Sequence, residues 1–108
     1  MMASTLEFAE YVYEQIASAG DISYRKMFGS FGIYMDQKFI GLICEDQLFI
    51  KPTAIGREIL ERPTEAPPFN GAKNWFLIED LENRDLLAHL LVATWGELPF
   101  LKPKKTKK

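Results

Sequence analysis

The stretch that decides the fold is RKMFGSFGIY, which runs from Arg25 to Tyr34. Gly29 and Gly32 stand three residues apart in sequence that otherwise reads as strand. Glycine inside a strand contributes no side-chain packing and loses much backbone entropy on folding. We therefore predict a sharply bent hairpin here, which leaves the basic pair Arg25-Lys26 on the outside of the molecule.

Strand signals surround this bend and continue after it, with short turns between them. The turn dipeptides are Asp36-Gln37 and Glu45-Asp46. Connections of this length leave no room for a helical crossover, so the strands must pair antiparallel. The expected strands cover residues 23–28, 31–35, 39–44 and 47–51.

The chain before the strands reads as an amphipathic helix over residues 5–19. Ser4 followed by Glu7 matches a capping box, and Gly20 supplies a C-terminal stop. Apolar residues recur between them at helical spacing, while Gln15 groups with the glutamates on the polar side.

A short second helix is expected over residues 54–61. Gly56 inside it costs about 1 kcal/mol relative to alanine, so this helix depends on tertiary packing. The proline-rich segment 63–72 predicts a surface loop with one short edge strand near Phe69, and residues 74–79 read as the last strand.

The last helix is expected over residues 82–95, with Asp80 preferred to Asn83 as its cap. His89, the one histidine of the chain, falls on the polar face four residues after Asp85. A surface ion pair at this spacing is worth little. No third group converges on the imidazole, so we expect no catalytic residues.

The order helix, strand meander, helix, one or two strands, helix predicts an α+β fold. Helices with one apolar side need a single apolar partner, which a two-layer sandwich provides. We expect an antiparallel sheet of about five strands with the helices packed on one face. The expected organisation is one domain over residues 1–101 and a flexible basic tail over residues 102–108.

Charge is divided unevenly between the body and this tail. Without the tail lysines, 8 basic residues face 15 acidic ones, a balance of −7 over residues 1–101 against −2 for the whole chain. An acidic body repels phosphate at long range, whereas a basic tail can bind nucleic acid weakly. The candidate nucleic-acid contacts are therefore Lys102, Lys104, Lys105, Lys107 and Lys108.

Several functional classes find little support in the composition. No apolar run approaches the length that crosses a bilayer, and the N-terminus lacks the features of a signal peptide. Cys44 is the single cysteine, so no internal disulfide forms, which agrees with a cytoplasmic location. Because Cys44 lies in an apolar strand before acidic residues, we expect an inert, buried thiol. One cysteine and one histidine make no common zinc site, so we expect neither metal nor cofactor.

A longer pattern surrounds the two glycines. It reads R-x-M-F-G-x-F-G-I-Y-x-D over Arg25–Asp36, then F-x-G-L-I over Phe39–Ile43, then QLFIK over Gln47–Lys51. This pattern resembles the N-terminal domain of the TfoX/Sxy family, and Trp75–Ile78 is similar to its late strand. The resemblance covers roughly residues 5–98.

The resemblance implies a small α+β domain related to secretion-chaperone-like folds. It also implies a link to natural competence, in which full-length members assist transcription together with the cyclic-AMP receptor protein. Such members carry a helical C-terminal domain that does not follow here, so we expect a stand-alone domain. We accordingly expect a non-enzymatic regulatory or adaptor domain that acts through a protein partner, with a homodimer as one form.

Three hypotheses for the site remain open at this point. The first is a protein-interaction surface on the uncovered face of the sheet, to which Tyr24 also contributes. The second is a DNA-associated cofactor that uses the lysine tail, and the third is a small anion or nucleotide site at the bend. Ordinary core packing is the alternative for the aromatic residues. The candidate interaction surface comprises Arg25, Lys26, Phe28, Gly29, Phe31, Gly32, Tyr34, Lys51 and Trp75.

Overall fold

A computed structural model describes residues 5–27 and 29–99 of the chain. Ser4, Phe28 and the tail 102–108 therefore lie outside the described residues, and the roles expected above for Phe28 and the tail stay predictions.

The fold is α+β, as the sequence predicts, with six strands rather than about five. All neighbouring strands pair antiparallel, in the order β1-β2-β3-β4-β6-β5. The elements are α1 (Leu6–Ile16), the short 3-10 turn η1 (Ala17–Ala19), β1 (Ile22–Met27), β2 (Ser30–Met35), β3 (Lys38–Cys44), β4 (Gln47–Ile50), α2 (Ala54–Leu60), β5 (Thr64–Ala66), β6 (Trp75–Ile78) and α3 (Arg84–Glu97).

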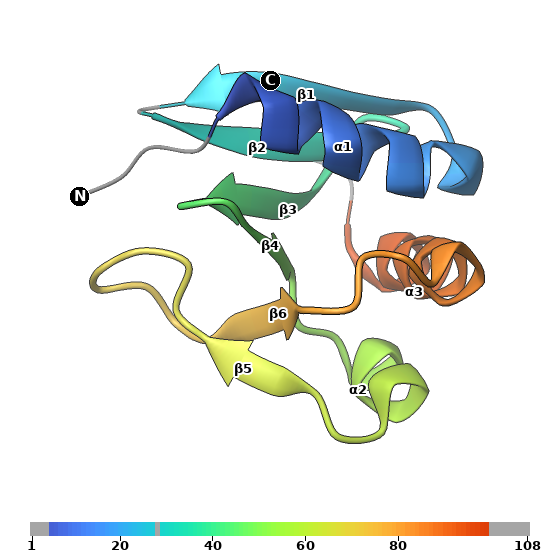
Figure 1. Ribbon diagram of the computed structural model, residues 1–108. Helices are drawn as coiled ribbons and strands as arrows, with labels where there is room; N and C mark the ends of the chain where they lie inside the picture. The colour runs from blue at the N-terminus through green and yellow to red at the C-terminus, as the bar shows by residue number, and fades with distance from the viewer. Residues whose placement is uncertain (1–4, 28, 100–108) are drawn as a thin grey trace, which may run out of the picture.

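The three helices cover one face of the sheet, while the loop between β5 and β6 projects on the opposite side (Figure 1). The main core fills the space between the helices and the sheet, which confirms the two-layer expectation. Its fully buried side chains include Val12, Ile16, Ile33, Ile40, Ile43, Leu48, Ile50, Phe76, Leu87, Leu90 and Leu91.

Two-residue turns fix the register of the meander. Asp36 and Gln37 have φ values of 45° and 72°, and Glu45 and Asp46 have values of 53° and 58°. Two consecutive positive φ values match the twist of the flanking strands in a tight hairpin. Gly29, with a φ of 82°, occupies the turn between β1 and β2 and so provides the expected bend.

A β-bulge in β3 changes which side chains face the helices. Tyr34 pairs with Phe39, but Ile33 pairs with Gly41, so Ile40 is the extra residue. A Cβ on Gly41 would lie 2.6 Å from the Phe49 carbonyl oxygen. Glycine is therefore required after the bulge, since no other residue fits against β4.

The helix ends differ from the sequence expectation in which residue caps them. α1 begins at Leu6, and its cap is Thr5, whose Oγ1 accepts from the Phe8 amide at 3.1 Å. Asn83, not Asp80, caps α3, because its Oδ1 accepts from the Leu86 amide at 3.1 Å. Asp80 instead accepts from the Glu82 amide in the preceding turn.

Two further expectations are wrong in detail. Gln15 is only 6% exposed, because it joins α1 to the start of α3: its Nε2 donates to the Leu81 carbonyl, and its Oε1 accepts from Arg84. The short edge strand β5 lies at Thr64–Ala66, ahead of the expected place near Phe69. Phe69 itself is exposed in the loop that follows β5.

No helix in the described part of the chain is long and apolar enough to cross a membrane.

Candidate functional site

The sheet face turned away from the helices, here called the outer face, carries a row of three aromatic side chains. Tyr34 on β2 and Phe39 on β3 are register partners, with ring centroids 5.2 Å apart. Phe39 and Trp75 on β6 meet edge to face at 6.0 Å. All three rings are partly exposed, so the row is a surface feature rather than part of the main core.

Two cations stack on this aromatic row. The guanidinium carbon of Arg25 lies 5.4 Å from the centroid of the Tyr34 ring. The ammonium of Lys51 lies 4.7 Å from the centroid of the Phe39 ring. Such contacts are worth about 0.5–1 kcal/mol at exposed sites. The structure thus brings four of the predicted surface residues together on one face, namely Arg25, Tyr34, Lys51 and Trp75.

Lys51 is a partly buried cation. It follows β4, and continuing the β4–β6 register places it opposite Trp75. Burial lowers the pKa of the Lys51 ammonium below its ordinary value of 10.5. No carboxylate among residues 5–27 and 29–99 forms an ion pair with it, so an anion from outside would find an unneutralised charge there.

Gly32 contributes to the outer face by lacking a side chain. It lies between Arg25 on β1 and Leu42 on β3 in the register. A Cβ at this position would lie 2.9 Å from the Met27 sulfur and 3.3 Å from Cε1 of Phe39. These two side chains therefore occupy the space that a side chain at position 32 would need, so glycine is required there for the Phe39 ring to keep its position.

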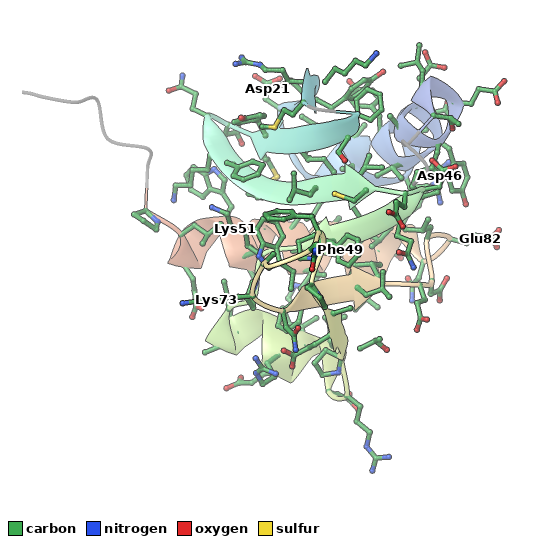
Figure 2. The ribbon with its side chains drawn as sticks, turned by 90° about the vertical axis from the view of Figure 1, so that its left-hand side faces the viewer. Asp21, Asp46, Phe49, Lys51, Lys73 and Glu82 are labelled. Atoms are coloured by element: carbon green, nitrogen blue, oxygen red, sulfur yellow. The ribbon has the colours of Figure 1, made fainter. Side chains whose placement is uncertain are left out.

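The centre of the outer face is apolar and closed. Leu42, Cys44 and Phe49 are at most 8% exposed, although no helix covers them. The loop over residues 67–74 lies on this side of the sheet, and Figure 2 shows it beside Phe49 and Lys51 on the face turned to the viewer. The Cys44 thiol is buried, as expected, within this small cluster.

Three residues that were expected on the uncovered face, Tyr24, Lys26 and Phe31, lie on the helix-covered side of the sheet. Phe31 is 5% exposed and belongs to the main core, where its ring meets Tyr24 edge to face at 5.8 Å. Tyr24 therefore also lies on the helix-covered side of the sheet. Lys26 pairs with Phe31 and is exposed, but its side chain projects opposite to that of Arg25 because strand residues alternate.

Phe39 was not among the predicted surface residues, although the sequence holds the signal for it. A two-residue turn at Asp36-Gln37 pairs Met35 with Lys38 and hence Tyr34 with Phe39. Counting outward from that turn places both rings on one face. The bulge at Ile40 obscures the pattern, because it breaks the alternation along β3.

The residues considered for catalysis or metal binding do not come together in a site. His89 and Asp85 are both exposed on α3, and no hydrogen bond or ion pair between them is present. Within the described ranges, no group of three or more His, Cys, Asp and Glu side chains could hold a metal ion.

A family model described as the TfoX N-terminal domain matches residues 14–97 of this chain. The chain belongs to the TfoX N-terminal domain family. It is also 34% identical over 107 residues to a Spirochaeta aurantia protein described as an uncharacterized 12.7 kDa protein in the trpE 5' region. That match covers 98% of this chain and 93% of the relative. In this TfoX N-terminal domain, the aromatic row and its two cations form the candidate site.

Proposed function

We propose that this TfoX N-terminal domain is a non-enzymatic adaptor that binds a protein partner through its outer face. The observation that carries the proposal is the pair of stacked cations, Arg25 on Tyr34 and Lys51 on Phe39, at 5.4 and 4.7 Å. Neither cation has a carboxylate partner in the part of the chain that the structure describes.

The chemistry of this surface favours a protein over a small molecule. Aromatic residues and arginine are enriched where proteins bind one another, and their rigid rings lose little entropy on contact. A guanidinium stacked on a ring keeps its edge available for a carboxylate. Because residues 1–101 carry a balance of −7, two cations at one place make a local site for an acidic group of the partner.

The partner class that we propose is the transcription machinery, through which the domain would take part in regulating competence. The resemblance of the Arg25–Lys51 segment to the TfoX/Sxy family supports this choice of partner class. Binding to a long polyanion is less favoured, because the charge of the body opposes it.

The test is affinity capture from the native host with purified domain on a resin. The double variant Arg25→Ala/Lys51→Ala should lose the partner that the wild type retains, while its thermal melting stays similar. Arg62→Ala, which removes an exposed cation that follows α2, is the matched control and should retain the partner. Equal capture by the wild type and the double variant would reject this surface.

A further inference from the structure

β1 is a long, open edge of the sheet. It spans six residues, contains no proline, and no described strand pairs with its outer side. The opposite edge is different: β5 has three residues and leads into Pro67 and Pro68, which cannot donate backbone hydrogen bonds. Natural sheets usually blunt such edges, so an extended edge is a place for another strand to add.

Alternation in the β1–β2 ladder determines which backbone groups the edge offers. The Asp36 amide donates to the Asp21 carbonyl at 3.0 Å, so residue 21 bonds toward β2. Inward and outward residues then alternate, which turns the amides and carbonyls of Ile22, Tyr24 and Lys26 outward. The edge therefore presents three residues with unsatisfied donors and acceptors.

The side chains of this edge specify the charge of a partner strand. Arg25 and Lys26 are consecutive, so one projects on the outer face and the other on the helix side. Both are exposed, and neither pairs with a carboxylate in the described ranges. A strand laid along β1 would meet both cations if it carried two consecutive acidic residues.

We propose that an extended acidic segment of a protein partner adds to β1 as a further strand of the sheet. Its backbone bonds with Tyr24 and Lys26, while its two consecutive carboxylates face Arg25 and Lys26. This inference rests on the proposed function and specifies the chemistry and the docking mode of the partner.

A second copy of this chain is a poorer occupant of the same edge. In an antiparallel β1–β1 pair centred near Arg25, the two basic pairs would face each other. Like charges directly opposite each other destabilise a strand pair. The same repulsion protects the free protein from edge-to-edge association.

The probe is a blocked peptide of sequence Thr-Val-Glu-Asp-Val-Thr, and its matched control is Thr-Val-Gln-Asn-Val-Thr. Backbone amide resonances of the whole domain are followed by NMR during titration to millimolar peptide. With the acidic peptide, we expect the Tyr24 and Lys26 amides to shift and their hydrogen exchange to slow at least tenfold. The control peptide should bind more weakly, by about fivefold for each exposed ion pair lost.

Two substitutions at Lys26 separate its charge from its backbone donor. Lys26→Ala removes only the cation, so the loss in affinity should stay within about fivefold. Lys26→Pro also removes the outward amide, which an edge strand tolerates, and should abolish binding while the β1–β2 pair persists. Arg62→Ala should bind the peptide as the wild type does.

Any one of the following results would overturn the proposed strand addition. Shifts confined to Tyr34, Phe39 and Lys51 would place the peptide on the outer face alone, which retains the proposed function and rejects strand addition. Equal binding by Lys26→Pro, or no shift at millimolar peptide, rejects it as well. Protection that depends on protein concentration alone would assign the edge to a second copy. Equivalent shifts with an oligothymidylate would assign it to nucleic acid.

Discussion

The ammonium of Lys38 lies 2.7 Å from the carbonyl oxygen of Trp95 and 3.8 Å from the centroid of the Trp95 ring. The same Nζ donates to the Leu98 carbonyl. Lys38 is 5% exposed, so a nearly buried cation holds the C-terminal end of α3 against the turn between β2 and β3. The last carbonyls of a helix lack partners within the helix and carry its negative dipole end, which explains the attraction.

Replacing Lys38 by methionine should destabilise the fold by about 2 kcal/mol. The aliphatic stem is retained, but the carbonyls lose charge-assisted hydrogen bonds, each of which contributes about 1.5–3 kcal/mol. Urea unfolding gives the change in the free energy of unfolding. Lys73→Met, at an exposed lysine in the 67–74 loop, is the control and should stay within about 0.5 kcal/mol of the wild type. A Lys38→Met variant as stable as this control would contradict the capping role.

Alanine should have opposite effects at two helical glycines. At Gly56 in α2, a Cβ would lie 2.8 Å from Thr53 Oγ1 and 2.9 Å from Cε2 of Phe76, so Gly56→Ala should cost about 1–2 kcal/mol despite its better helix propensity. At Gly96 in α3, no heavy atom lies within 4 Å of a Cβ, and Gly96→Ala should gain about 0.5–1 kcal/mol. Thermal melts of both variants measure this contrast, and a stabilised Gly56→Ala variant would disprove the close packing.

Thr94 should tolerate the loss of its hydroxyl. Its side chain is fully buried in α3, and its Oγ1 has no hydrogen-bond partner in the described structure. Thr94→Val keeps the shape and removes an unsatisfied polar atom, so we expect a gain of about 1 kcal/mol. Thr94→Ala also removes a methyl group and leaves a cavity, so it should destabilise. Chemical denaturation distinguishes the two, and a destabilised valine variant would point to a hidden partner for the hydroxyl.

The lowered pKa of Lys51 has a consequence for stability at high pH. In the window between this lowered pKa and 10.5, the unfolded chain binds a proton that the folded chain has released, so stability rises with pH through that window. Lys51→Met lacks this titration. Urea unfolding at neutral pH and near pH 10.5 should therefore show the wild type gaining stability relative to the variant. If the wild type instead lost stability relative to the variant, the contact between the Lys51 ammonium and the Phe39 ring would outweigh the cost of desolvating the ammonium.

Patterns formed by residues close together in the sequence predict most of the fold. The two-residue turns, the strand alternation and the helical apolar stripes identify every helix and the strands from β1 to β4 within a few residues. β5 was misplaced because it has three residues and its pairing depends on β6, which follows it in the chain. The caps Thr5 and Asn83 compete with Ser4 and Asp80, which are residue types that cap helices about as well, so residue type alone could not choose between them.

The parts of the site that the sequence did not reveal depend on long-range packing. Gln15 reads as a surface residue on α1, and its burial follows from the arrival of Leu81 and Arg84 from a distant segment. Lys38 likewise reads as a turn lysine, because its partners lie 57 and 60 residues later. Phe31 was misassigned because an aromatic residue beside a glycine turn fits either face until the register is known.

The placement of β6 between β4 and β5 affects how the chain folds while it is being synthesised. Residues 22–50 can form their meander as they leave the ribosome, but β4 has no neighbour on its far side until residues 75–78 emerge. A nascent chain that pauses in the 67–74 segment therefore exposes an apolar strand with unpaired amides, which is the kind of intermediate that chaperones protect.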